Sequence, residues 1–244
     1  MKRMSIYIGT SGWSYDHWDG ILYPPGLPPR QRLGSYLARY PTVEVNSTFY
    51  HWPAERTFVR WEEQLPEGFR MTIKAPRGLT HSKRLYAPEK WIQTVHHSML
   101  CLKAHRGVLL VQLPPAFALD IARLAYFLEY LPSDFKTAIE FRHPSWHNDE
   151  VFTLLERTGV AYCIMSGAQL PCHLRATADF VYVRLHGPDR GSLYAGSYSD
   201  ADLRWWAHRI REWRSMNKEV FVYFNNDGGG NAVRNADTLR WMLS

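Results

Sequence analysis

Cysteine is scarce in this sequence: the 244 residues include three, Cys101, Cys163 and Cys172, an odd number without regular spacing. Small secreted domains are held together by even sets of closely spaced cysteines, so a disulfide framework is excluded. The three cysteines are therefore expected to be reduced thiols of a cytoplasmic protein. Cys101 falls within a helical pattern and Cys163 within an apolar run, so both are expected in the core.

Long apolar runs are also missing. No stretch reaches the roughly 18 apolar residues that a membrane-spanning helix needs. The first residues, Met1–Ser5, lead into a strand pattern without the apolar segment of a secretory signal. The sequence therefore predicts neither membrane insertion nor secretion, and the cytoplasm is the expected location.

Acidic residues are the minority among the charges, since 29 Lys and Arg stand against 23 Asp and Glu, a net charge of +6. The basic residues are spread along the chain rather than gathered in one block. An excess of this size fits an anionic small ligand or a nucleic acid, and it equally fits an ordinary solvated surface. A small anionic ligand is the expected partner, nucleic acid is the alternative, and no pattern predicts the oligomeric state.

Strand and helix patterns alternate along the chain, with no linker and no internal repeat between them. Runs typical of strands occupy Ile6–Thr10, Val43–Asn46, Phe69–Lys74, Val108–Gln112, Thr137–Arg142, Val160–Met165, Phe180–His186 and Val220–Asn225. Helical patterns occupy Gln31–Arg39, Glu55–Leu65, Pro88–His105, Leu119–Leu131, Asp149–Arg157, Asp200–Met216 and Ala232–Met242.

Strands that alternate with helices in this way indicate parallel βαβ units. The length is close to the ~250 residues of a (β/α)8 barrel, and 45% hydrophobic residues suffice for its core. We therefore predict a single-domain α/β fold, a (β/α)8 TIM-type barrel over residues 1–244 with irregular βα loops. A doubly wound open sheet is the alternative. One irregular stretch, Gly167–Ala178, contains no recognisable helix.

Five of the strand patterns end with polar side chains at alternate positions. Side chains two apart on a strand share one face, so each of these strands separates an apolar set from a polar set. Because the working residues of barrels follow the carboxyl ends of strands, the pattern predicts an enclosed polar site there. The polar residues are Glu44, Asn46, Thr72, Lys74, Glu140, Arg142, Arg184, His186, Tyr223 and Asn225.

Three cations in this set, Lys74, Arg142 and Arg184, indicate an anionic ligand, because unpaired buried charge is costly. Arginine can hold a phosphate or carboxylate through two parallel hydrogen bonds. The alternative is an internal network in which Glu44 and Glu140 neutralise the cations. Both readings are compatible, since such a network can also position a ligand.

The candidate groups for proton transfer are Glu140, His186 and Glu44, because histidine titrates near neutral pH and carboxylates serve as acids or bases. Neighbouring cations lower carboxyl pKa values and so weaken either glutamate as a general acid. The sequence leaves open whether any reaction is catalysed. The residues expected to bind the ligand are Asn46, Lys74, Gln112, Arg142, Arg184, Tyr223, Asn225 and Asp227.

No cofactor is predicted. A divalent metal held by Glu44, Glu140, His186 and Asp227 is the minor alternative, since carboxylates and imidazole suit zinc or manganese. The sequence contains neither an HExxH motif nor paired cysteines. The glycine-rich run Asn225–Ala232 follows the last strand, where barrels often bind phosphate. An ordinary tight turn capped by Asn231 explains that run equally well.

The helical pattern Asp200–Met216 carries a stripe of large apolar residues. The stripe, at helical spacing, consists of Leu203, Trp206, Ile210 and Trp213. It is typical of a helix face that packs on a core. Arginines at 204, 211 and 214 lie off this stripe and are expected to form a solvated face, with a nucleic-acid footprint as the lesser alternative.

Several blocks of this sequence resemble the YecE-like family. They are Gly9–Trp13, Val43–Tyr50, Lys74–Arg77, Gln112–Pro115, Glu140–Trp146, Arg184–Gly187 and Tyr223–Asp227. The resemblance spans nearly the whole chain. It implies a TIM-type barrel from a bacterial and archaeal family of unknown function. At the level of the fold, members resemble metal-dependent AP endonucleases and sugar isomerases, which makes a nucleic-acid-binding protein or a metal-dependent phosphodiesterase the alternative function.

Overall fold

The computed structural model describes residues 4–167 and 169–244. Eight parallel strands form one sheet in the order β1-β8-β7-β6-β5-β4-β3-β2. They are β1 Ile6–Thr10, β2 Thr42–Val45, β3 Arg70–Lys74, β4 Arg106–Gln112, β5 Lys136–Glu140, β6 Ala161–Ser166, β7 Phe180–Leu185 and β8 Glu219–Phe224. Because β1 pairs with β8 and is also bridged to β2 through Ser11 and Glu44, the fold is a TIM-type α/β barrel, as predicted.

Helices follow most of the strands and lie close to the predicted positions. They are α1 Pro29–Leu37, α2 Ser47–Tyr50, α3 Glu55–Glu62, α4 Glu89–Leu100, α5 Ile121–Glu129, α6 Asp149–Thr158, α7 Asp200–Ser215 and α8 Asn231–Leu243. The short helix α2 was not predicted. The predicted helix Pro88–His105 is too long, because Lys103 adopts a left-handed conformation (φ 47°) and the last residues form a separate 3-10 turn before β4.

Local sequence explains where the helices begin and end. Asn148 caps α6 by accepting a hydrogen bond from the Val151 amide, and Gly159 ends this helix with φ 66°. Ser199 and Asp202 form a reciprocal capping box at the start of α7. Gly230, rather than Asn231, occupies the cap position of α8.

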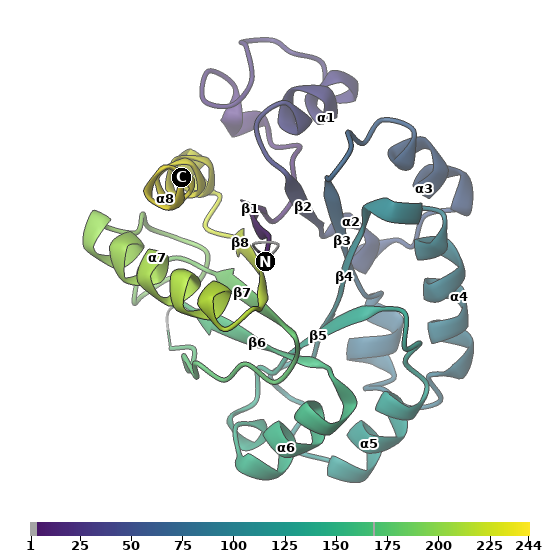
Figure 1. Cartoon of the computed structure of the whole chain (residues 1–244). Coiled ribbons are helices and arrows are strands. Elements are labelled where there is room, and N and C mark those ends of the chain that lie inside the picture. Colours follow the sequence, from purple (N-terminus) through teal and green to yellow (C-terminus); the bar gives the residue numbers. More distant parts are fainter. Residues whose placement is uncertain (1–3, 168) are drawn as a thin grey trace. The chain divides into compact units, whose positions relative to one another are not determined.

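The chain divides into two compact units. Two of the boundaries fall inside strands β2 and β6, and the other two fall in the connection between β6 and β7. Unit 1 comprises the described residues of Met1–Glu44, Ile164–Leu174 and Asp179–Ser244. Its strands β1, β8 and β7 run side by side in register, with α7 and α8 packed together beside them (Figure 1). That the whole chain forms a single domain stays a prediction.

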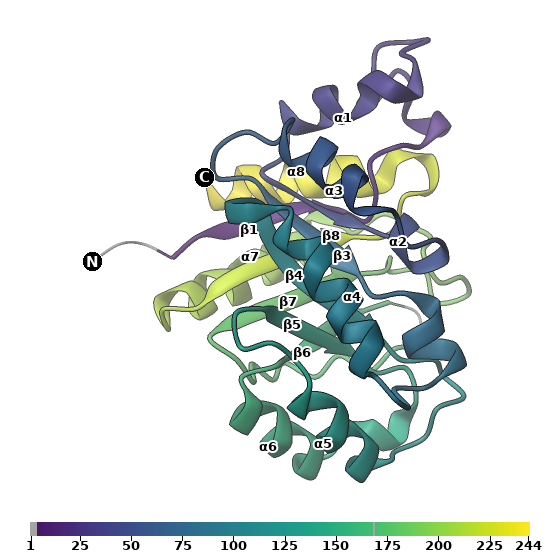
Figure 2. The same cartoon turned by 90° about the vertical axis from the view of Figure 1, so that its right-hand side faces the viewer.

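Unit 2 comprises Val45–Cys163 and Arg175–Ala178. Strands β3, β4 and β5 pair in parallel, and the first residues of β6 extend this arrangement. Helix α3 packs on α4, and α5 on α6 (Figure 2). The residues of β4 between Gly107 and Gln112 are buried, which agrees with the near-continuous apolar runs of parallel strands.

The connection between β6 and β7 differs from the other connections. Its described residues form no helix, in agreement with the irregular stretch predicted at Gly167–Ala178; Ala168, within that stretch, lies outside the described residues. Thr177 anchors the far end of the connection, because its hydroxyl accepts a hydrogen bond from the Tyr162 amide and donates one to the Val160 carbonyl.

None of the helices in the described part of the chain has both the length and the apolar character that crossing a membrane requires.

One glycine in unit 1 is required by a close approach of two backbones. A Cβ atom added to Gly9 in β1 lies 2.2 Å from the Thr42 carbonyl oxygen, so the strands must shift to accept it. We expect Gly9→Ala to lower the free energy of unfolding by about 1–3 kcal/mol. Urea denaturation of the purified variant measures this change.

The matched control for this prediction is Gly34→Ala in α1. A Cβ atom at Gly34 meets nothing within 4 Å. Since alanine is the better helix former, this variant should gain about 0.5–1 kcal/mol. Equal effects of the two substitutions would show that the approach at Gly9 does not limit the packing.

Candidate functional site

The best-defined polar cluster of unit 1 surrounds Glu44, near the end of β2. The side chain of Glu44 is fully buried. One carboxylate oxygen accepts hydrogen bonds from Ser11 Oγ at 2.6 Å and from Arg184 Nη2 at 2.7 Å. The other accepts from the Tyr182 hydroxyl at 2.6 Å and from Arg184 Nε at 2.9 Å. We call these four residues the Glu44 cluster.

The strand periodicity explains how Tyr182 and Arg184 come to face Glu44. They are two residues apart on β7, so their side chains point to the same face. Arg184 presents two nitrogens in the parallel, bidentate geometry that a guanidinium forms with a carboxylate. The alternative predicted from the sequence, an internal pair of cation and glutamate, is therefore present at this position.

The charge state of Glu44 follows from these contacts. Burial raises its pKa, but the charge of Arg184 and the hydrogen bonds from Arg184, Ser11 and Tyr182 outweigh burial and hold the pKa below its usual value. Burial, with the charge of Glu44, raises the pKa of Tyr182 well above its usual value. Glu44 is thus an ionised carboxylate that accepts four hydrogen bonds, an arrangement suited to fixing neighbouring side chains.

His186 follows β7 and is also fully buried. Its Nδ1 lies 3.2 Å from the side-chain amide nitrogen of Asn225. The distance is within hydrogen-bond range. The structure thus brings together two residues that were predicted from the sequence.

Two further predicted residues of unit 1, Tyr223 and Asp227, do not belong to the Glu44 cluster. The Tyr223 hydroxyl lies 2.7 Å from Thr42 Oγ1. Asp227 lies in the loop after β8, where His17 Nε2 is 2.8 Å from its carbonyl oxygen and 3.7 Å from its carboxylate. Burial raises the pKa of the Asp227 carboxyl.

Unit 2 contains a second acidic centre at Glu140, the last residue of β5, which is fully buried. Gln112 Nε2 donates to its Oε1 at 2.6 Å, and Arg142 Nε forms an ion pair with the same oxygen. The Cys163 thiol lies 3.8 Å from Oε2. Gln112, Glu140 and Arg142 were all predicted, and the structure places them in one hydrogen-bonded group.

Lys74, at the end of β3, lies in a different setting within unit 2. Its ammonium is 4.3 Å from the centre of the Phe49 ring, a cation–π geometry. The His81 ring packs edge-on against Phe49, with centroids 4.9 Å apart. Thr48 fixes α2 on β3, because its hydroxyl donates to the Lys74 carbonyl oxygen at 2.7 Å. We call Lys74, Arg77, His81 and Arg142 the cation cluster.

The pKa of His81 reflects its partial burial and the positive charges of the cation cluster. Partial burial lowers its pKa, and the charges of Lys74, Arg77 and Arg142 lower it further, to about 4, against one opposing contribution from Glu140. His81 is therefore neutral at physiological pH. The imidazole interacts electrostatically with three cations and one carboxylate, so the net potential around it is positive.

The sequence analysis missed several of these residues. The strand periodicity offered a signal for Tyr182, which is two positions before Arg184, and for Ser11, which directly follows β1. No sequence pattern predicted a role for His81, because it lies in a single π-helical turn, Gly78–Ser82, which is too short for a periodic pattern. Phe49 lies on the short helix α2, which was itself not predicted.

The predicted metal alternative has no assembled ligand set in the described residues, which contain no group of three or more His, Cys, Asp and Glu side chains placed to hold a metal ion. Glu44 and Glu140 are each engaged by an arginine instead.

Comparisons with known proteins agree with the sequence resemblance. The family model described as "Protein of unknown function DUF72" matches residues 7–244. The UPF0759 protein YunF of Bacillus subtilis is 29% identical, with 98% of this chain and 94% of that protein covered. The UPF0759 protein YecE of Escherichia coli is 30% identical over 58% of this chain and 50% of its own length.

Solved structures show the same relationship. The crystal structure of a DUF72 family protein from Thermotoga maritima has a TM-score of 0.87 and 30% identity, with 98% of this chain and 99% of that chain covered. A second DUF72 structure, from Enterococcus faecalis, has a TM-score of 0.85 over 98% of this chain and 95% of that chain at 23% identity, and so supports the fold alone. The resemblance to the YecE-like family is confirmed.

Removing the charge of Glu44 leaves Arg184 buried without its counterion. We expect Glu44→Gln to lower the free energy of unfolding by about 3–5 kcal/mol, the range for a broken buried ion pair. Denaturant unfolding measures the loss. The control is Glu156→Gln, which disrupts the exposed pair with Arg175 and should cost less than about 1 kcal/mol. Similar losses in both variants would contradict the structural role of Glu44.

The same contact predicts a pH dependence. The folded-state pKa of Glu44 lies below its unfolded value of about 4.3, so its contribution to stability is complete above that pH and is lost as the pH falls through the folded-state pKa. The stability difference between the wild type and Glu44→Gln should therefore shrink in acid. A difference that grows with falling pH would refute this assignment.

Proposed function

The chain belongs to the DUF72 family, and we propose that it binds a small ligand carrying a phosphate or carboxylate group at the cation cluster of unit 2. Lys74 and Arg142 would hold the anion, with Arg77 and His81 beside them. The observation that carries the proposal is the position of the buried Lys74 ammonium and the His81 imidazole against one ring, Phe49. The charges of Arg77 and Arg142 also act on this imidazole. Such a surplus of positive charge is stabilised when an anion enters.

The geometry around Phe49 supports this proposal. The Phe49 ring contacts both the Lys74 ammonium and the His81 imidazole, so these two side chains lie on one side-chain platform. Lys74 is about nine-tenths buried, and its backbone carbonyl is anchored by Thr48. A lysine held in this way is already ordered, so less side-chain entropy is lost when a ligand binds.

Arg142 brings the planar guanidinium that suits phosphate and carboxylate. Its Nε is engaged by Glu140, which fixes the orientation of the guanidinium plane. Glu140 is in turn held by Gln112. In the proposed site Gln112 therefore acts through Glu140, as a residue that positions Arg142.

Asn46 indicates a further group that the ligand should carry. Its side-chain oxygen is buried and has no hydrogen-bond donor among the described residues. Since a buried acceptor is stabilised by a donor, a ligand with a hydroxyl group beside its anionic group suits this position. Phosphorylated sugars and hydroxy acids have this combination.

The predicted ligand-binding residues of unit 1 are not part of the cation cluster. Arg184 directs two nitrogens at Glu44. Its contact with a ligand stays a prediction, as do the ligand contacts of Tyr223, Asn225 and Asp227. Proton transfer by Glu140 is likewise part of the proposal, and proton transfer by His186 in unit 1 stays a prediction.

The test of this proposal follows the titration of His81 by NMR, with the signal assigned through His81→Gln. Inorganic phosphate bound beside the imidazole should raise the pKa of His81 from about 4 toward its usual 6.5, because an anion stabilises the imidazolium. By linkage, phosphate should bind more tightly as the pH falls through the pKa of His81. Phosphate that leaves the titration unchanged would refute the proposal.

Two variants sharpen this test. Lys74→Met removes one cation, so it should raise the pKa of His81 in the absence of phosphate and weaken phosphate binding about tenfold or more. Lys90→Met removes an exposed cation on α4 and should change neither quantity. Single-stranded DNA serves as a further ligand: an effect of DNA without an effect of phosphate, sensitive to salt, would favour the nucleic-acid alternative.

A further inference from the structure

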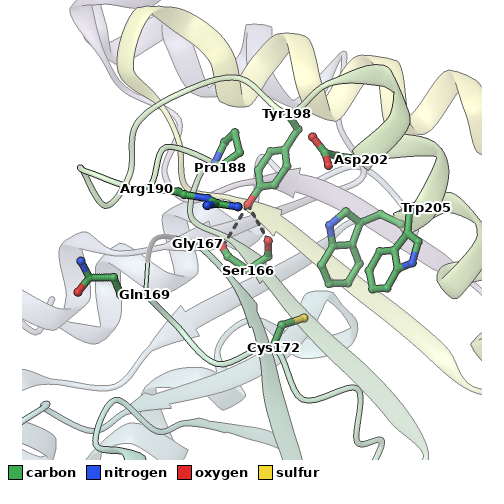
Figure 3. A pocket seen from close by; sticks show the side chains of 10 residues that line it. Ser166, Gly167, Gln169, Cys172, Pro188, Arg190, Tyr198, Asp202 and Trp205 are labelled. Atoms are coloured by element: carbon green, nitrogen blue, oxygen red, sulfur yellow. Dashed lines mark hydrogen bonds between the residues drawn. The ribbon is translucent and has the colours of Figure 1, made fainter.

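Unit 1 contains a cavity of about 610 Å³ that the function proposed above does not use (Figure 3). This volume lies in the range of small-molecule sites, about 300–1,000 Å³. The lining residues come from the end of β6 and the connection after it, from the loop after β7 and from the first half of α7. Those that carry the argument are Ser166, Cys172, Arg190, Tyr198, Asp202 and Trp205.

The origin of the cavity is the connection between β6 and β7. In a TIM-type barrel a helix normally follows each strand and covers the sheet. The described residues of this connection are irregular, and they form one wall of the cavity while α7 forms the opposite wall (Figure 3). The cavity therefore reflects the architecture and does not depend on a single side chain.

The walls on the α7 side are aromatic. Trp205 and Trp206 meet nearly at right angles, with ring centroids 4.9 Å apart. Trp206 is buried, whereas Trp205 is 44% exposed, unusual for the largest apolar side chain. The guanidinium of Arg209 lies 5.6 Å from the centre of the Trp205 ring.

Tyr198 makes the rear of the cavity rigid. Its hydroxyl accepts a hydrogen bond from the Gly187 amide at 3.0 Å and lies 3.1 Å from the Ser166 carbonyl oxygen (Figure 3). These contacts tie the loop after β7 to the end of β6. Tyr198 and Ser166 are therefore held in place before a ligand enters.

Two opposite charges line the same cavity. Arg190 is exposed and forms no hydrogen bond or ion pair with another described residue. One carboxylate oxygen of Asp202 accepts hydrogen bonds from the amide and the hydroxyl of Ser199. The other oxygen has no donor among the described residues. Among the described lining residues, these two are the only charged side chains, so their charges sum to zero.

From these features we infer that the cavity binds a zwitterionic α-amino acid with a large apolar side chain. Arg190 pairs with the carboxylate, Asp202 receives the ammonium group, and the apolar side chain packs against the indole of Trp205. A neutral lining with one charge of each sign favours a ligand that is itself neutral and dipolar. A nucleoside monophosphate, a dianion, lacks a second cation here.

The test measures binding of L-phenylalanine to the full chain by calorimetry, against two analogues that each lack one charge. N-acetyl-L-phenylalanine lacks the ammonium group and L-phenylalanine amide lacks the carboxylate. We expect L-phenylalanine to bind at least about tenfold more tightly than either, because each analogue loses one charge-assisted hydrogen bond. Equal affinity of the three compounds would overturn the proposal.

The position of the ligand is checked through Cys172, an exposed thiol in the cavity wall. L-phenylalanine should slow alkylation of Cys172 by a maleimide and leave Cys101 unaffected. Arg190→Gln should weaken binding of L-phenylalanine about tenfold without changing that of the amide, whereas Arg204→Gln, an exposed arginine outside the lining, should change neither. Protection by adenosine monophosphate in place of L-phenylalanine, or no protection, would overturn the proposal.

Discussion

The buried pair of Glu44 and Arg184 is the constraint on which unit 1 depends. Two charges removed from water are tolerated only when their hydrogen bonds are satisfied, and here the carboxylate accepts four. The pair therefore fixes Tyr182 and Ser11 as well, and with them the ends of β7 and β1. In unit 2 the buried carboxylate of Glu140 is stabilised in a similar way, since Gln112 and Arg142 both contact its Oε1 atom. In each unit a fully buried glutamate, Glu44 or Glu140, thus orders its neighbours.

The fold was predictable because its signals are local and repeated. Apolar runs, turn residues and helix caps alternate along the whole chain, and errors arose where a short element interrupts this alternation. Helix α2 has four residues, too few for a periodic pattern, and α4 ends early because Lys103 takes a left-handed conformation that its residue type does not predict. Strand boundaries agreed to within about two residues because burial on both faces leaves long apolar runs.

The candidate site was predictable in its residue types and less so in its pairings. Alternation identified Glu44, Lys74, Glu140, Arg142, Arg184 and His186. Whether a cation meets a carboxylate, an aromatic ring or a ligand depends on contacts between residues distant in sequence. Arg184 meets Glu44 across 140 positions, while Lys74 lies over Phe49. His81 shows the limit most clearly, since its low pKa arises from burial and from the charges of Lys74, Arg77 and Arg142.

The helix-free connection after β6 has a further consequence for how such a protein diversifies. A segment without a helix carries no periodic packing requirement, so residues 169–174 tolerate changes of length and composition at small cost in stability. Across the cavity, Trp206 stays buried in α7 and preserves the opposite wall. Ligand preference at this position can therefore evolve by altering one short segment, while the strands that present Glu44 and Glu140 keep their sequence.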